Sequence, residues 1–177
     1  MYEVELRSFL TKEKYEELLL FFHKHAQFIN EDEQTTYYFN APVDLRLQQN
    51  THHARLIVKK GSMHDDAREE IEIPFARDDF SRMHDILNLS GFSLQVKWLR
   101  KRFLFRWEEI VVTLDDTKGY GFILELEKQC GTEEKERVLA LLQEKLIVLD
   151  VALTPKQEFE QKFADYNKNW KFLLGHL

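Results

Sequence analysis

The first residues of the chain carry the side chains best suited to chemistry. Glu3, Glu5 and Arg7 alternate with apolar residues. In a β-strand, alternate side chains point to opposite faces, so the two carboxylates and the guanidinium would share one face. Carboxylate oxygens bind hard divalent cations, and a guanidinium binds phosphate at two points. This segment therefore predicts a strand that holds a metal ion and an anion side by side.

The same alternation of charged and apolar residues recurs in later segments. Glu-x-Glu pairs appear in three of the predicted strands, and arginine is the usual cation. Since arginine makes oriented two-point contacts, its frequent use favours an anion site. A solvent-facing sheet also alternates polar and apolar residues, so the argument depends on the whole set and not on one strand. That set is Glu3, Glu5, Arg7, Arg46, Arg55, Lys59, Arg68, Glu70, Glu72, Arg100, Arg102, Arg106, Glu125 and Glu127.

These faces must be positioned by strands and helices that the chain also predicts. Alternation indicates strands over residues 1–9, 33–39, 43–49, 54–60, 67–74, 94–108, 109–114 and 121–128, with a loop over 115–119. Capping and periodicity indicate helices after Thr11, over 78–90, over 133–146 and from Thr154 towards Phe172. If the charged faces converge, the fold is α+β. We expect a closed eight-stranded antiparallel β-barrel, or tunnel, with a charged lumen and about four α-helices covering it outside.

Composition limits the class of protein. The 177 residues fit a single domain spanning 1–177, and the net charge of −6 argues against general nucleic-acid binding. No apolar run approaches the roughly 20 residues needed to span a bilayer. The one cysteine, Cys130, excludes a disulfide framework and a thiolate zinc site. We expect a cytoplasmic protein without membrane association, present as a monomer or a homodimer.

The chemistry that suits such a lumen is phosphoryl transfer. Carboxylates would hold Mg²⁺ or Mn²⁺, while arginines and a lysine would bind phosphate oxygens around it. A Ser-His-Asp or Cys-His nucleophile is not apparent in the sequence. We therefore expect the nucleophile to be either water activated at the metal or a hydroxyl group of the substrate.

Six segments, in order, resemble the signature of the CYTH superfamily, the triphosphate tunnel metalloenzymes. They are residues 3–7, 37–47, 58–61, 68–72, 100–105 and 114–127, and together they span most of the chain. The resemblance implies an eight-stranded tunnel that binds a triphosphate-containing small molecule and one or two divalent cations. Family members include inorganic, thiamine and RNA triphosphatases and class IV adenylyl cyclases. Two positions depart from the family pattern: Arg7 stands where the signature has lysine, and Phe105 where it has tyrosine.

The charge pattern and the resemblance together assign roles to individual residues. The expected metal ligands are Glu3, Glu5, Glu70, Glu72, Glu125 and Glu127. The expected substrate-binding residues are Arg7, Arg46, Arg55, Lys59, Lys60, Arg68, Arg100, Arg102 and Arg106. Face alternation favours Lys59 over Lys60, whereas the position before Gly61 favours Lys60. The expected catalytic residues are Glu5, Arg7, Asp115 and Glu127, with Asp115 at the tunnel mouth or acting on the nucleophile.

The expected activity is metal-dependent hydrolysis of a triphosphate, either inorganic or organic. One alternative is cyclisation of ATP by a class IV adenylyl cyclase mechanism. A second alternative is a module that binds polyphosphate or a nucleotide without turnover, which the replacement of the signature lysine by Arg7 favours.

Overall fold

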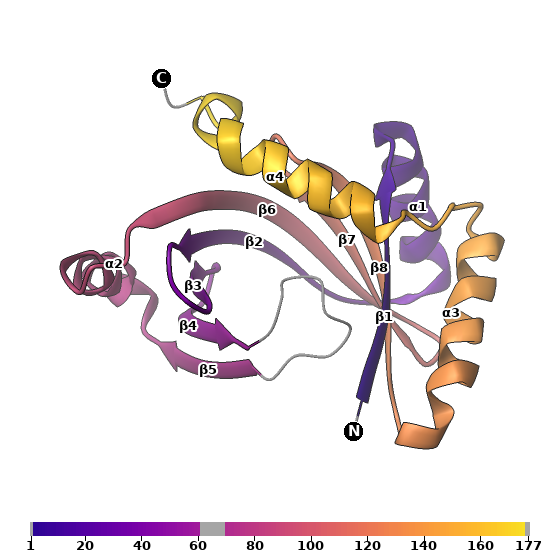
Figure 1. The fold of residues 1–177 in the computed structure, drawn as a ribbon. Coiled ribbons are helices and arrows are strands. Elements are labelled where there is room, and N and C mark those ends of the chain that lie inside the picture. Colours follow the sequence, from indigo (N-terminus) through magenta and orange to yellow (C-terminus); the bar gives the residue numbers. More distant parts are fainter. Residues whose placement is uncertain (1, 61–69, 176–177) are drawn as a thin grey trace.

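Eight antiparallel strands form one strongly curved sheet in the computed structural model, which describes residues 2–60 and 70–175 (Figure 1). The strands are β1 (Tyr2–Leu10), β2 (Gln27–Phe39), β3 (Asp44–Gln49), β4 (Ala54–Lys59), β5 (Glu70–Phe75), β6 (Leu94–Trp107), β7 (Ile110–Thr117) and β8 (Gly121–Cys130). Their hydrogen-bonded order is β1-β8-β7-β6-β2-β3-β4-β5. The long strands β2 and β6 curve along their length, so the sheet has a concave and a convex face (Figure 1).

Eight antiparallel strands are confirmed, but closure of the barrel is not. In the described part of the chain, β1 and β5 are the two edges of the sheet, and no ladder joins them. Alternation along a strand determines which face a side chain occupies, whereas it does not determine which two edges meet. The hydrogen bonds of the described residues therefore form an open, strongly curved sheet.

Strand register places the predicted charged residues on the concave face. Glu5 lies opposite Glu127, and Arg7 lies opposite Glu125. Arg102 of β6 lies opposite a carboxylate of β7. Directly opposite residues share a face, so this register brings charges from strands distant in sequence together.

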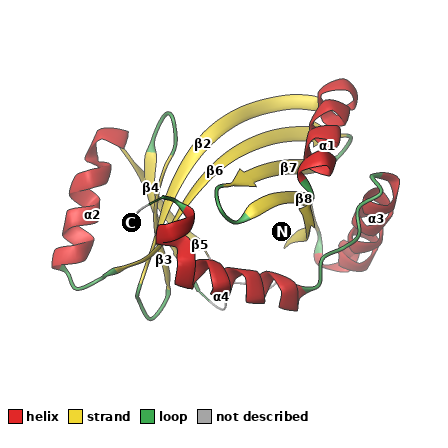
Figure 2. Cartoon of the chain, turned by 90° about the horizontal axis from the view of Figure 1, so that it is seen from above, coloured by secondary structure: helices red, strands yellow, loops and turns green. Residues whose placement is uncertain are grey.

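Three helices cover the apolar convex face: α1 (Lys12–His25), α2 (Phe80–Leu89) and α3 (Lys135–Val148). Thr11 caps α1 by accepting a hydrogen bond from the backbone N–H of Lys14 at 3.2 Å. Helices α1 and α3 pack on the half formed by β1, β8, β7 and β6, and α2 packs on β3 and β4 at the opposite end of the molecule (Figure 2). Burying each large apolar side chain stabilises this layer by roughly 1.5–3 kcal/mol.

The fourth helix, α4 (Lys156–Leu173), does not belong to this outer layer. Its aromatic residues pack against concave-face side chains at one end of the strands, among them Tyr38 and Ile123. The hydroxyl of Tyr166 donates to the carbonyl of Lys97 at 2.9 Å and to that of Lys118 at 3.3 Å. The expectation of four outer helices is therefore wrong for α4, which lies across one end of the concave face.

Two strand boundaries also differ from the predictions. β7 runs to Thr117, so Asp115 lies within a strand and not in a loop at a tunnel mouth. β2 begins at Gln27, six residues before the predicted start. Both extensions are polar and acidic, and both pair with the cation-rich part of β6: Asp32 and Asp115 each lie opposite Arg102. Cross-strand charge attraction outweighs the low strand propensity of aspartate here. Short 3-10 turns, Arg77–Asp79 and Thr132–Glu134, precede α2 and α3.

None of the helices in the described residues combines the length and the apolar character that crossing a membrane requires.

Candidate active site

A cavity of about 270 Å³ opens on the concave face. Among the described residues, six cationic and three acidic side chains line it: Arg7, Arg46, Arg55, Lys59, Arg100, Arg102, Glu5, Glu125 and Glu127. All nine were predicted to be site residues. The cations come from β1, β3, β4 and β6, and the acids from β1 and β8. The curvature of the sheet thus brings together charges that are far apart in the sequence.

The remaining predicted residues lie elsewhere. Glu72 binds Arg55 at 3.2 and 3.0 Å and does not line the cavity itself. Arg106 shares the concave face by register, but it is exposed and lies outside the cavity lining. Lys60 is exposed just beyond β4, whereas Lys59 lines the cavity. The predictions for Arg68 and for the side chains of Glu3 and Glu70 lie outside the described residues.

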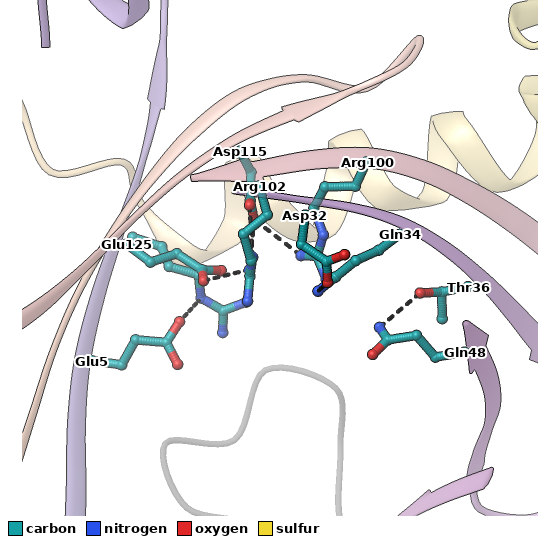
Figure 3. A network of polar contacts seen from close by, with 10 residues as sticks. Glu5, Asp32, Gln34, Thr36, Gln48, Arg100, Arg102, Asp115 and Glu125 are labelled. Carbon is teal, nitrogen blue, oxygen red and sulfur yellow. Dashed lines mark hydrogen bonds and ion pairs between the residues drawn. The ribbon is translucent and has the colours of Figure 1, made fainter. Parts of the chain in front are cut away.

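Asp115 forms the buried centre of a partly buried ion-pair network on the cavity wall (Figure 3). Its Oδ1 accepts from Arg102 Nε at 2.7 Å, and its Oδ2 accepts from Arg102 Nη2 at 2.6 Å and Arg100 Nη1 at 3.0 Å. Arg102 Nη2 also donates to Glu125 at 2.9 Å. The Asp115 side chain has no exposed surface. Its position behind two arginines makes it a group that orients them.

The ionisation of this network follows from its burial and pairing. Burial alone would raise the pKa of Asp115, but Arg100 and Arg102 more than offset this effect and lower its pKa below the usual value. Burial likewise opposes the charge on Arg102, while Asp115, Glu125 and Glu5 raise its pKa above the ordinary value. The two groups therefore remain a charged pair at neutral pH.

A second layer of polar side chains, not predicted from the sequence, supports the arginines (Figure 3). Gln34 accepts from Arg100 at 3.0 Å and donates to Asp32 at 3.1 Å. On β3, Gln48 accepts a hydrogen bond from Arg55 of β4 at 2.7 Å and donates one to Thr36 of β2 at 2.9 Å. The four supporting residues, Asp32, Gln34, Thr36 and Gln48, are buried. The period-2 spacing of Asp32, Gln34 and Thr36 with Tyr38 could have revealed the first set, had β2 been extended towards its acidic start.

The supported guanidinium groups still present hydrogen-bond donors. Arg7 uses Nε to bind Glu5 at 2.7 Å, and its guanidinium lies over the ring of Phe159 at 5.9 Å. Among the described residues, its two terminal nitrogens have no hydrogen-bond or ion-pair partner. Within the same part of the chain, the same holds for Arg55 Nη2 and Arg102 Nη1. Arg46 is held by Asp44 through two bonds at 2.7 and 2.5 Å. Fixed arginines with remaining N–H groups are suited to binding phosphate oxygens.

The carboxylates match the chemistry of a hard divalent cation. Glu5 and Glu127 lie directly opposite each other on β1 and β8, and both line the cavity. Within residues 2–60 and 70–175, no group of three or more acidic, histidine or cysteine side chains forms a metal site by itself. Magnesium commonly takes only one or two protein carboxylates, together with phosphate oxygens and water. Glu5 and Glu127 therefore fit a metal whose coordination a bound phosphate completes.

Three kinds of comparison relate the chain to known proteins. It is 37% identical over 87 residues to a Methanocaldococcus jannaschii protein named "Putative adenylate cyclase". That match covers 48% of this chain and 48% of the relative, so the chain spans about half the length of the curated relative it matches.

Solved structures share the fold at low sequence identity. A conserved hypothetical protein of Pyrococcus furiosus is 20% identical with a TM-score of 0.71, covering 85% of this chain and 91% of its own. A Pyrococcus horikoshii protein is 18% identical with a TM-score of 0.72, covering 87% and 95%. A Hippeastrum adenylyl cyclase homologue, described as having a dominant triphosphatase activity, is 20% identical with a TM-score of 0.62, covering 89% and 94%.

The family assignment rests on the match of the whole sequence pattern. Residues 1–164 match the family model described as the CYTH domain, and this range contains the eight strands and every charged residue that lines the cavity. The chain therefore belongs to the CYTH domain family.

Proposed function

We propose that this chain hydrolyses a triphosphate-containing small molecule in the concave-face cavity, with Mg²⁺ or Mn²⁺ as the metal. The observation that carries the proposal is the convergence of six cationic side chains and three carboxylates on one cavity of about 270 Å³. A triphosphate spreads its charge over a chain of oxygens, and cations on several walls can bind more than one phosphate group.

The contacts of the cavity residues suggest a different role for each group of them. Phosphate oxygens would be bound on one side of the cavity by Arg7 of β1 and by Arg100 and Arg102 of β6. On the side formed by β3 and β4, they would be bound by Arg46, Arg55 and Lys59. Glu5 and Glu127 would hold the metal, which when bound would neutralise phosphate charge and lower the pKa of coordinated water. Glu127 would also orient the attacking water. Asp115, expected from the sequence to be catalytic, instead acts in this proposal as a positioning residue for Arg100 and Arg102.

Phosphate release tests the proposal directly. The purified protein would be incubated with inorganic triphosphate, ATP and thiamine triphosphate, each with Mg²⁺, with Mn²⁺ and with EDTA. We expect metal-dependent release of phosphate from at least one substrate. No release from any of them, at concentrations where calorimetry shows the ligand bound, would establish a binding module without turnover and contradict the hydrolase.

A second candidate, cyclisation of ATP, has its own support. The Methanocaldococcus jannaschii relative bears an adenylate cyclase name, although the match covers only half of each chain. The reaction of the Hippeastrum homologue favours hydrolysis instead. The same ATP incubation, analysed for cyclic AMP and pyrophosphate, separates the two reactions because hydrolysis produces neither a cyclic nucleotide nor, in a γ-phosphate cleavage, pyrophosphate.

A further inference from the structure

We infer that the chain has a second ligand site, which binds a phosphate monoester that carries a flat ring, such as a nucleoside monophosphate. The site is a cleft of about 610 Å³ between α2 and the C-terminal part of α4. Helix α4 runs from the α3 side of the molecule towards the α2 side (Figure 1, Figure 2). The second site is independent of the proposed function, because no described residue lines both the cleft and the concave-face cavity.

Strand register places the floor of the cleft on the convex face of the sheet. Tyr37 of β2 lies directly opposite Lys97 of β6, and both residues line the cleft. Their chain neighbours Tyr38 and Trp98 line the concave-face cavity. Since successive residues of a strand point to opposite faces, the cleft and the cavity lie on the two sides of one sheet.

One wall of the cleft is apolar and could hold the ring of a ligand. Tyr37, Phe80, Leu94 and Trp170 form this wall. The ring centroid of Tyr37 lies 5.1 Å from that of Phe80 and 5.3 Å from that of His84, at steep interplanar angles of 70° and 76°. These contacts hold the wall in place before a ligand binds. Small-molecule sites typically measure about 300–1,000 Å³ and combine such apolar walls with a few polar groups, as the cleft does.

Two cations in the cleft are available for an anion. Neither Arg77 nor Lys97 makes a side-chain hydrogen bond or ion pair within residues 2–60 and 70–175. The Lys97 ammonium lies 5.4 Å from the centroid of the Tyr37 ring, a cation–π contact that keeps it at the floor of the cleft. A guanidinium binds phosphate at two points, and an ammonium adds a point charge. The pair is therefore suited to the phosphate group of a ligand.

The remaining polar groups narrow the class of ligand. Asp78 is the one carboxylate among the described residues that line the cleft, and the side chains of Gln49 and Ser81 are neutral. A carboxylate only accepts hydrogen bonds, so it matches a hydroxyl or amino group and not a second phosphate. A nucleoside monophosphate carries one phosphate, ribose hydroxyls and a flat base. These three parts match the two cations, the carboxylate and the apolar wall.

The three tryptophans of the chain can report on the two sites separately. Trp170 lines the cleft, Trp98 lines the concave-face cavity, and Trp107 is buried in the core under α1 and α3. Their indole N–H signals would be followed by nuclear magnetic resonance while adenosine monophosphate (AMP) is added in the presence of EDTA. We expect a saturable shift of the Trp170 signal and an unchanged Trp107 signal. A Trp170 signal that does not move at saturating AMP would overturn the inference.

Substitutions of cations distinguish the cleft from the concave-face cavity. Lys97→Gln removes a charged partner of the phosphate, so the Kd for AMP, measured by calorimetry in EDTA, should rise about tenfold or more. Two matched controls each remove one positive charge elsewhere and should change this Kd less than about twofold. Arg55→Gln acts in the concave-face cavity, and Lys171→Gln acts on α4 beside Trp170 but outside the cleft lining.

The pattern of losses decides the outcome. Equal losses in Lys97→Gln and Lys171→Gln would show only a general effect of charge, and a loss confined to Arg55→Gln would place AMP in the concave-face cavity. Either result would overturn the second site. Arg77→Gln provides the same test if Lys97→Gln does not fold. Adenosine and inorganic phosphate, which each lack one part of AMP, should bind wild-type protein at least about tenfold more weakly than AMP. Equal affinity of inorganic phosphate and AMP would overturn the role of the apolar wall.

Discussion

Asp115 and Arg102 are joined at two points across neighbouring strands, with Nε to Oδ1 at 2.7 Å and Nη2 to Oδ2 at 2.6 Å. The carboxylate has no exposed surface, and it also binds Arg100. A two-point contact fixes the plane of the guanidinium, which a single contact cannot do. The pair therefore determines how two arginines face the cavity, and its removal should affect stability and substrate binding together.

Asp115→Asn should destabilise the protein strongly. The neutral amide would leave two partly buried guanidinium groups without the buried counter-charge that they share. Breaking a buried ion pair from one side typically costs about 3–5 kcal/mol. Urea unfolding followed by circular dichroism measures the loss. Asp116→Asn is the control, because Asp116 points to the opposite face of β7 and should change the free energy of unfolding by less than about 1 kcal/mol. Similar stability of the two variants would contradict the central role of the pair.

Stability should fall in alkaline solution as Tyr15 ionises. Burial, followed by the charges of Asp116, Asp115 and Glu31, raises the pKa of Tyr15 to about 12. A raised folded-state pKa favours the protonated form, so this contribution is complete below the unfolded pKa of about 10 and is lost as the pH rises through the folded value. We expect wild-type unfolding free energy to drop between pH 10 and 12.

Tyr15→Phe provides the check on this alkaline effect. The variant lacks the ionisable hydroxyl, so its loss between pH 10 and 12 should be smaller than that of the wild type by about 1–2 kcal/mol. Urea unfolding at pH 9, 10, 11 and 12 measures both proteins. Parallel curves for the two proteins would show that Tyr15 does not cause the fall.

Glu5→Gln should abolish metal-dependent turnover and largely preserve the fold. Glu5 lies directly opposite Glu127 on the neighbouring strand, so removing its charge relieves repulsion between like charges. The same substitution removes a proposed metal ligand. We expect phosphate release to fall at least a hundredfold, with thermal stability close to that of the wild type. Glu16→Gln, on the exposed face of α1, controls for loss of one acidic charge. A large loss of stability in Glu5→Gln would instead identify Glu5 as a structural partner of Arg7.

Gln34→Leu should weaken substrate binding more than turnover. The substitution removes the amide that joins Arg100 to Asp32, while Arg100 keeps its bond to Asp115. A less restrained Arg100 should raise KM for triphosphate about three- to tenfold with little change in kcat. Thr35→Val, on the opposite face of β2, should leave both constants unchanged. Equal effects of the two variants on KM would show that Gln34 does not orient Arg100.

The N-terminal strand shows how far sequence reasoning reaches. Strict alternation placed Glu5 and Arg7 on one face. The same reasoning favoured Lys59 over Lys60 but left the choice open, and Lys59 is the one that lines the cavity. The predicted strand began only at residue 33, so the acidic start of β2 was missed, and residues 115–119 were predicted to be a loop. Aspartate has low strand propensity, so neither segment carries a local strand signal. Both are strands because Arg102 lies opposite Asp32 and Asp115, a pairing that involves residues far apart in the chain.

Local periodicity was thus enough to establish two things, the two faces of each strand and the charged character of one of them, because side-chain direction in a strand depends only on odd or even position. Tertiary structure decided the partners of each charge and the placement of α4 across one end of the concave face. It also decided that β1 and β5 are the two edges of the sheet in the residues that the structure describes. These features depend on which strands pair and in which register, and both are set by contacts between segments that no local pattern joins.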